Sequence, residues 1–260
     1  MTIRLRRITS TSLAQIDSDS QTMRSKAASG TPGLDIQQLL QASAWYPTLS
    51  EEAQRQVRSD VVERTMAAGE ALICHGQTAL WWSGVLEGVL KWSTGTRRGR
   101  SVTLGGLTVG SWFGEGSLLR QRPVEADIVA LRFSRVALLP RETFDWLYLT
   151  QPSFGRFLVN QINERLHWFM GAFAAHRLLS VEAQVARALM GLVHPWLHPG
   201  GVLHLQISQE ELSNLVGLSR QRCNRALRLF KADGLVKTEY GGITILDVDR
   251  LREMMLVEQR

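Results

Sequence analysis

The sequence predicts an α+β protein in which a β-rich domain, a long helix and a smaller mixed domain follow one another. Three observations lead to this prediction. Short apolar runs separated by glycines fill residues 67–140, apolar positions recur at helical spacing over residues 152–179, and two short helical patterns precede a hairpin over residues 208–245. The domain boundaries that we expect are 1–33, 34–150, 151–179 and 180–260.

The composition is that of an ordinary globular protein. With 260 residues, 44% of them hydrophobic and 21% charged, the chain is long enough for two modest domains. A formal charge of +6 suggests a polyanionic partner. No apolar run reaches the roughly 18 residues that a membrane helix needs, and no secretion signal follows the basic amino terminus. We therefore expect a cytoplasmic protein without a membrane partner.

The amino-terminal part of the chain is predicted to lead into the β-rich domain. Residues 1–33 are polar and rich in Ser, Thr and Gln, which predicts a poorly ordered extension. Residues 34–66 look helical throughout, because their apolar positions recur at helical spacing. Ser50, followed by Glu51 and Glu52, is a plausible start for one of these helices.

The middle of the chain reads as many short strands. The runs EALICH, LWWSGVLEGVLKWST, RSVTLGGL, EADIVALRF and RVALLP are punctuated by glycines, a pattern typical of a sandwich or a small barrel. Four tryptophans of this segment either line a pocket or fill the core, and we expect them to fill the core. They are Trp81, Trp82, Trp92 and Trp112.

A short helix over residues 141–150 and a long one from residue 152 follow. The apolar stripe of the long helix is wider than a surface helix needs. Either the helix packs only on its own domain, or it also packs on a second copy of itself, because a two-stranded coiled coil asks for apolar spacing of this kind. The stripe contains Phe154, Leu158, Ile162, Arg165, Phe169 and Phe173, with Phe157, Leu166 and Met170 beside it.

After a break at residues 178–180, VEAQVARALMGLVHPWL predicts another helix and VLHLQI a strand. Ser208 and Glu211 then form an S-x-x-E capping box, in which each side chain satisfies the other residue's free backbone N–H. Gly217 supplies a left-handed turn, and Ser219 caps a second helix that runs to about Ala232. LVKTEY, two glycines and ITIL complete a hairpin, so the unit is a winged helix–turn–helix.

The second helix of this unit has the side chains of a DNA-reading helix. Such a helix lies in the major groove, where Arg pairs with guanine and Gln or Asn with adenine. The competing interpretation is a solvated basic helix. The residues expected to read bases are Arg220, Gln221, Asn224, Arg225 and Arg228, and those expected to contact phosphates are Ser208, Ser219, Arg222 and Lys231.

On three blocks of sequence, residues 60–252 resemble the CRP–FNR family of bacterial transcription regulators. The blocks are ALICHGQ with VLEGVLKW, then LTVGSWFGEGSLL, then ISQEELSNLVGLSRQRCNRALRLFKADGLV. The resemblance implies a cyclic-nucleotide-binding-type jelly-roll β-barrel as sensor, a dimerisation helix and a hinge near Leu179. It also implies a homodimer that reads a near-palindromic site on double-stranded DNA, an effector at the sensor, and RNA polymerase as a further partner.

The family's cyclic-nucleotide pocket is only partly retained. Gly114 and Glu115 match the residues that serve the ribose, but Glu125 and Ala126 stand where nucleotide-binding members carry Arg and then Ser or Thr. A carboxylate facing a phosphate is repulsive. The positions that contact the purine fall near Phe169 and Met170, which are apolar, and Arg120 or Arg122 would have to replace the lost cation. This pattern disfavours cyclic AMP as the effector, whose identity stays open.

Other cofactors and classes of protein find little support. With only Cys74 and Cys223, the chain lacks the cysteines of a disulfide scaffold, an iron–sulfur cluster or a multi-cysteine zinc site, and we expect no metal. Both thiols are expected to be buried. No catalytic motif is present, so an enzyme is not expected. The alternative is a cyclic-nucleotide-binding regulatory or scaffold protein whose helix–turn–helix mediates protein contacts.

Overall fold

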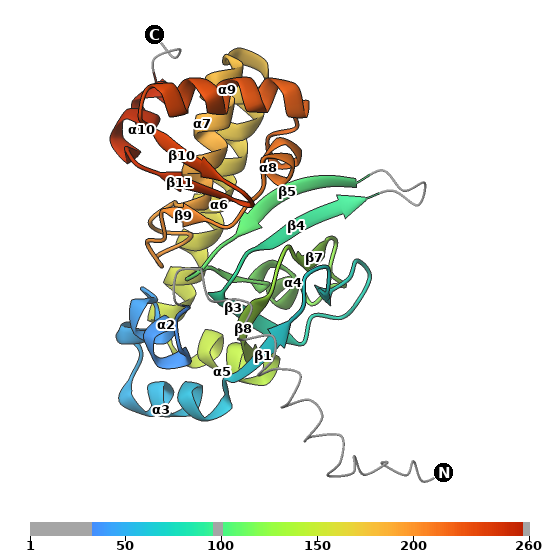
Figure 1. Ribbon diagram of the computed structural model, residues 1–260. Coiled ribbons are helices and arrows are strands. Elements are labelled where there is room, and N and C mark those ends of the chain that lie inside the picture. Colours follow the sequence, from blue (N-terminus) through green and yellow to red (C-terminus); the bar gives the residue numbers. More distant parts are fainter. Residues whose placement is uncertain (1–32, 96–100, 257–260) are drawn as a thin grey trace, which may run out of the picture. The chain divides into compact units, whose positions relative to one another are not determined.

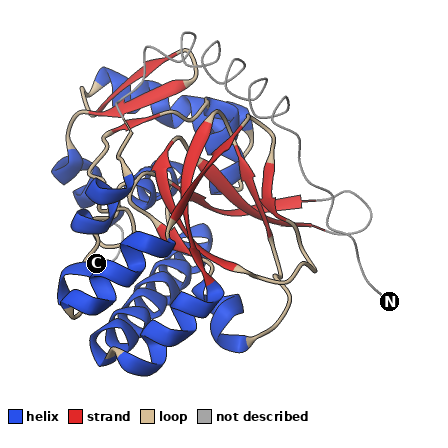
Figure 2. Cartoon of the chain, turned by 90° about the horizontal axis from the view of Figure 1, so that it is seen from below, coloured by secondary structure: helices blue, strands red, loops and turns tan. Residues whose placement is uncertain are grey.

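The computed structural model describes residues 33–95 and 101–256, and it has the mixed α+β architecture that the sequence predicts (Figures 1 and 2). The predicted extension over residues 1–33 lies, apart from Gly33, outside the described residues. The first described elements are α2 (Ile36–Ala42), the 3-10 helix η1 (Tyr46–Thr48), α3 (Glu51–Asp60) and the strand β1 (Val62–Met66).

The lead-in is helical as predicted up to residue 60, and Ser50 caps α3 through the backbone N–H of Ala53. The expectation of helix through residue 66 is wrong, because Val62–Met66 pairs antiparallel with a strand 70 residues later. The β-branched Val61 and Val62 favour extended backbone, and the pairing partner is invisible to local periodicity.

Two four-stranded antiparallel sheets form the sensor domain. Their orders are β1-β8-β3-β6 and β2-β7-β4-β5, and no described strand of one sheet pairs with a strand of the other. The domain is therefore a sandwich and not the closed barrel that the resemblance implied. Its strands after β1 are β2 (Ala71–Ile73), β3 (Trp81–Glu87), β4 (Leu90–Gly95), β5 (Ser101–Leu107), β6 (Trp112–Phe113), β7 (Asp127–Ala130) and β8 (Ser134–Pro140).

An aromatic cluster forms the core between the first sheet and the helices. Trp82 and Trp112 stack with ring centroids 4.4 Å apart, and Trp45 from the lead-in contacts both. Burial of Trp82 and Trp112 confirms the core prediction for these two residues. The core prediction is wrong for Trp81, which is 40% exposed, and for the half-buried Trp92, because both line a cavity of this domain.

One helix, α4 (Glu115–Arg120), lies within the segment that was predicted to form only strands. The helices that follow the sandwich agree with the pattern of the sequence, and they are α5 (Arg141–Thr150), α6 (Pro152–Leu178) and α7 (Val181–Leu192). The first turns of α6 are buried in the aromatic cluster through Phe154, Phe157 and Leu158. The helix α7 ends at Leu192, five residues before the end of the helical pattern.

The carboxyl-terminal elements surround a second core that includes Leu189, Leu212, Phe230 and Ile243. As Figure 1 shows, the strands β10 and β11 lie beside the helices α7, α9 and α10. This arrangement confirms the winged helix–turn–helix unit. The elements are β9 (His204–Leu205), α8 (Gln209–Val216), α9 (Arg220–Ala232), β10 (Val236–Glu239), β11 (Gly242–Ile245) and α10 (Val248–Leu256).

Candidate nucleic-acid interface and sensor cavity

The helix caps and the glycine turn that the sequence predicts for the helix–turn–helix are all present in the structure. Ser208 Oγ accepts from the backbone N–H of Glu211 at 3.1 Å, and Glu211 Oε2 accepts from the backbone N–H of Ser208 at 2.6 Å. Gly217 ends α8 with a φ of 75°, which a residue with a Cβ adopts only at a cost. Ser219 caps α9 through the N–H of Arg222. These contacts set the angle at which α9 leaves α8.

The helix α9 has a buried apolar face and an exposed basic face, and Leu229 is the one apolar side chain of the helix larger than alanine that is exposed, at 45%. Cys223, Ala226, Leu227 and Phe230 are buried in the second core. The opposite face is exposed, and among the described residues no carboxylate lies within 4 Å of any of its cations. The exposed polar residues are Arg220, Gln221, Arg222, Arg225, Arg228 and Lys231.

The other residues that were predicted to contact DNA are, apart from Ser219, less exposed to solvent. Ser219 is exposed at the start of α9, whereas Ser208 is half-buried at the start of α8. Asn224 is half-buried, and its Oδ1 is buried without a hydrogen-bond partner among the described residues. The face that α9 offers to a partner therefore consists chiefly of arginines, one lysine and Gln221.

Sequence reasoning missed Arg132, which follows β7 in the sensor domain. Its guanidinium donates to Glu211 Oε2 at 2.7 Å and to the carbonyl oxygen of Gly241, in the turn of the wing, at 3.3 Å. One sensor side chain thus holds both the capping box of α8 and the wing. A single arginine in a loop carries no motif, so the sequence offered no signal for this contact.

The sensor sandwich contains a cavity of about 950 Å³. Gly114, Glu115 and Arg120, which the sequence places at the effector pocket, line it. Arg122 and Met170 are exposed and are not among its lining residues, and Phe169 lines a different cavity. The apolar lining comes from both sheets and from α6, and it includes Leu72, Trp81, Trp92, Phe113, Ile128 and Ile162.

Glu115 is buried and forms an ion pair with Arg165 of α6. Arg165 Nη1 donates to Glu115 Oε1 at 2.9 Å, Trp82 Nε1 donates to Oε2 at 3.4 Å, and the carbonyl oxygen of Trp112 accepts from Arg165 Nη2. The sequence placed Arg165 on the apolar stripe without a partner. The single cation within this apolar stripe was the sequence signal for an ion pair, because a buried arginine needs a carboxylate partner.

The two other arginines among the described residues that line the sensor cavity are also paired with glutamates, but in pairs that are exposed to solvent. Arg64 lies 2.7 Å from Glu70, and Arg120 lies 3.3 Å from the Glu125 carboxylate that replaces the family's phosphate-binding arginine. With Arg165 also paired, the described lining offers a phosphate no uncompensated cation.

The two cysteines differ from each other. Burial raises the pKa of the Cys223 thiol to about 11, so it stays protonated, whereas Cys74 is exposed and the expectation of burial is wrong for it. No group of three or more His, Cys, Asp or Glu side chains that could hold a metal ion is found among the described residues. None of the helices in the described ranges is both long and apolar enough to cross a bilayer.

Comparisons with known proteins agree with this geometry. Residues 63–151 match the family model of the cyclic nucleotide-binding domain, and residues 183–254 match that of the Crp-like helix-turn-helix domain. The cyclic AMP receptor protein of Thermus thermophilus is 31% identical over 159 residues, which cover 60% of this chain and 70% of that protein. The HTH-type transcriptional regulator Cmr of Mycobacterium tuberculosis is 27% identical over 194 residues, covering 73% of this chain and 74% of its own.

A solved structure shares the fold as well. The structure of FixK2 from Bradyrhizobium japonicum superposes with a TM-score of 0.62 at 16% identity, covering 75% of this chain and 96% of that one. The relatives named here are regulators or receptors and not enzymes. With a cyclic-nucleotide-binding-type sensor followed by a DNA-binding helix–turn–helix, this chain belongs to the CRP–FNR family of transcription regulators.

Proposed function

We propose that the protein is a homodimeric regulator that inserts α9 of each subunit into a major groove of a near-palindromic DNA site. The observation that carries this proposal is the unpaired basic face of α9, whose opposite face is locked into a core. A rigid helix with free guanidinium groups can bind phosphates and the paired acceptors of guanine. Two half-sites are then expected about one helical turn, ~34–36 Å, apart.

The exposed part of α6 supports the homodimer. After its buried first turns, Ile162, Leu166, Met170 and Phe173 are between 41% and 65% exposed in the single chain. Their spacing of four, four and three residues keeps the four side chains on one face of the helix, against which a second helix can pack. A second copy of the same helix covers such a stripe, and it relates two α9 helices by the twofold axis that a near-palindromic site requires.

The sensor cavity supports an effector other than a cyclic nucleotide. Its arginines are each neutralised by a carboxylate, and Glu125 adds an anion where a phosphate would need a cation. Its remaining lining is largely apolar, which suits a ligand of apolar character. Filling or emptying this cavity would bias how the DNA-binding unit is presented to DNA and to RNA polymerase.

Selection of duplexes from random oligonucleotides, with the full-length protein, tests the proposal. We expect a near-palindromic sequence to be enriched, with two chains per duplex in solution and a steep loss of affinity as salt rises. A matched control is Arg120→Ala, which removes a cation that is already paired and lies outside α9, and which should select the same sequence. Duplex binding without sequence preference, or no binding, would instead favour a scaffold whose helix–turn–helix contacts proteins.

A further inference from the structure

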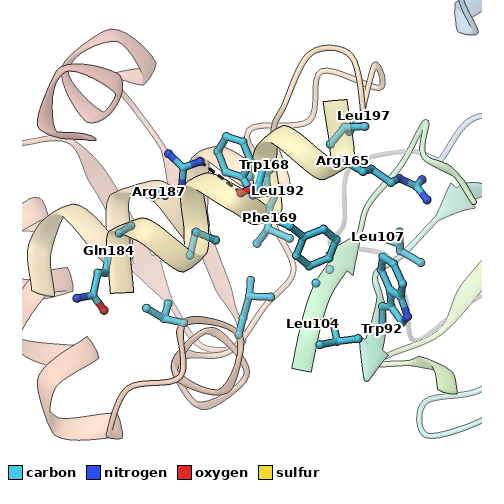
Figure 3. A pocket seen from close by; sticks show the side chains of 18 of the residues that line it. Trp92, Leu104, Leu107, Arg165, Trp168, Phe169, Gln184, Arg187, Leu192 and Leu197 are labelled. Atoms are coloured by element: carbon cyan, nitrogen blue, oxygen red, sulfur yellow. Dashed lines mark hydrogen bonds between the residues drawn. The ribbon is translucent and has the colours of Figure 1, made fainter. Parts of the chain in front are cut away.

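A second cavity, which shares Trp92, Leu107 and Arg165 with the sensor cavity, lies where β4 and β5 meet the helices α6, α7 and α8 (Figure 3). Its volume is about 140 Å³. Arg187 and Gln184 of α7 lie at one end, and Trp92, Leu104 and Leu107 of the sensor strands lie at the other, with Phe169 and Leu192 between them. No Asp or Glu is among the described residues that line it.

The middle and the sensor end of the cavity are apolar. A cavity of roughly 150 Å³ lined by Leu, Ile and Phe side chains accepts a benzene ring. Here Phe169 and Leu192 face the sensor strands across the space. Gly106 lets β5 approach α7 closely, because a Cβ at this position would clash with Leu192. This part of the cavity therefore has the size and the surface for one aromatic ring.

The other end holds a cation without a counter-ion. The Arg187 guanidinium stacks on the Trp168 ring, with Cζ 4.5 Å from the centroid, and fits only because residue 171 is glycine. Its one hydrogen bond, to the carbonyl oxygen of Trp168, is long at 3.4 Å, and its Nε is buried without a partner. Among the described residues no carboxylate pairs with it. Burial lowers the pKa of Arg187, as expected for a cation short of compensation.

Neighbouring polar groups do not provide the missing charge. Gln184 donates to the carbonyl oxygen of Leu179, and its own Oε1 is buried without a donor. His198, which also lines the cavity, is fully buried, and burial lowers its pKa to about 3, so it is neutral at pH 7. Arg165 is already paired with Glu115. Buried polar atoms without partners are rare in native structures and call for a ligand, a water or an ion.

We propose that this second cavity binds a small aromatic carboxylate, with its carboxylate against Arg187 and its ring beside Phe169 and Leu192. The carboxylate accepts from the unsatisfied guanidinium, and a hydroxyl group or a water molecule that enters with the ligand donates to Gln184. Such a ligand contacts the sensor strands, α6 and the helix α8 of the DNA-binding unit at once, through Leu104, Phe169 and Val216. This site adjoins the sensor cavity through Trp92, Leu107 and Arg165, but Arg187, Gln184 and Phe169 line the second cavity and not the sensor cavity.

Isothermal titration of the full-length protein with benzoate tests the proposal. We expect saturable binding of one benzoate per chain at millimolar concentration or below. Arg187→Gln should weaken it at least about tenfold, since it removes a charge-assisted hydrogen bond. The control is Arg177→Gln, which removes another cation stacked on a ring, 4.7 Å from the Phe173 centroid, that does not line the cavity. Benzyl alcohol, equal in shape but uncharged, should also bind at least about tenfold more weakly.

A second pair of variants tests the place of binding without touching the charge. Ala172 lines the cavity and Ala174 does not, although both are exposed on α6. Ala172→Leu should abolish benzoate binding and Ala174→Leu should preserve it. Absence of benzoate binding to the parent protein overturns the proposal. So does equal affinity in Arg187→Gln, equal affinity for benzyl alcohol, or full binding by Ala172→Leu.

Discussion

The arginines of α9 and the arginines of the sensor cavity are the same residue type in opposite electrostatic situations. On α9 the guanidinium groups are exposed, and none has a carboxylate within 4 Å among the described residues. In the sensor cavity Arg64, Arg120 and Arg165 each have a glutamate partner. One region leaves its positive charge available, and the other neutralises it internally.

This difference in the pairing of arginines determines how strongly each region can attract an anion. Free cations on a rigid helix attract a polyanion and can reach base edges, because they lose little by exchanging water and counterions for phosphates. A paired arginine offers a new anion little net attraction, since its Coulomb energy is already used by the glutamate. The helix α9 therefore presents cations without carboxylate partners among the described residues, whereas each arginine in the described lining of the sensor cavity has a glutamate partner.

The largest expected effect comes from breaking the buried pair of the cavity. Arg165→Met leaves the Glu115 carboxylate buried and unpaired, and should lower the free energy of unfolding by about 3–5 kcal/mol in urea denaturation. The control Arg120→Met breaks an exposed pair and should cost at most about 1 kcal/mol. Adding Glu115→Leu to Arg165→Met should restore most of the loss. If the two single variants lose equal stability, Arg165 is not a structural counter-ion.

The next effect concerns one residue of α9 that is proposed to read bases. Arg225→Ala should cost about 1–3 kcal/mol of binding free energy on the selected DNA site and relax the preference at one base pair, measured by fluorescence anisotropy. Lys231→Ala, at the other end of the helix, should weaken binding about equally on all sequences and reduce the salt slope by about 1. Equal losses on every sequence for Arg225→Ala would mean that this arginine contacts phosphate and not bases.

A smaller effect is expected from giving the cavity a free cation. Cyclic AMP should not raise the melting temperature or the DNA affinity of the parent protein. Glu125→Arg combined with Ala126→Ser removes the anion and releases Arg120, so cyclic AMP should then stabilise the protein by about 1 kcal/mol at roughly fivefold above its Kd. Glu125→Gln alone is the control that removes the repulsion and releases Arg120 without adding a new cation. Stabilisation of the parent protein by cyclic AMP would show that the sensor cavity binds a phosphate although its arginines are paired with glutamates.

The smallest effect concerns the buried face of α9. Thiol titration of the native protein at pH 8 should detect Cys74 alone, and alkylation should leave DNA affinity unchanged, because the Cys223 thiol is buried with a pKa of about 11. Unfolding should expose both thiols. Since the unfolded thiol ionises near pH 9 and the folded one near 11, the contribution of Cys223 to stability is complete below pH 9 and declines above it. Rapid labelling of both thiols at pH 8 would show that α9 opens.

The helix–turn–helix could be predicted almost in full from the sequence. Its determinants are the Ser208–Glu211 capping box, the left-handed Gly217 and the Ser219 cap, and each acts over three or four residues. The Gly114–Glu115 turn and the replaced positions Glu125 and Ala126 could also be located by their spacing. Short-range contacts of this kind leave a signature in a contiguous stretch of residues.

The contacts that escaped prediction join residues far apart in the chain. Glu115 and Arg165 are 50 residues apart, and Arg132 reaches Glu211 across 79 residues. The strand β1 was missed because its partner β8 lies about 70 residues later. No periodicity or capping rule links such positions, so only the folded chain brings them together.

The sequence by itself determined the order of the elements, the turn and caps of the DNA-reading unit and the residues on the basic face of α9. These follow from local backbone preferences and helical periodicity. The tertiary structure alone decided which charges are free. An arginine binds an outside anion or a neighbouring glutamate according to what lies within a few ångströms of it, and that distance is set by packing between distant segments.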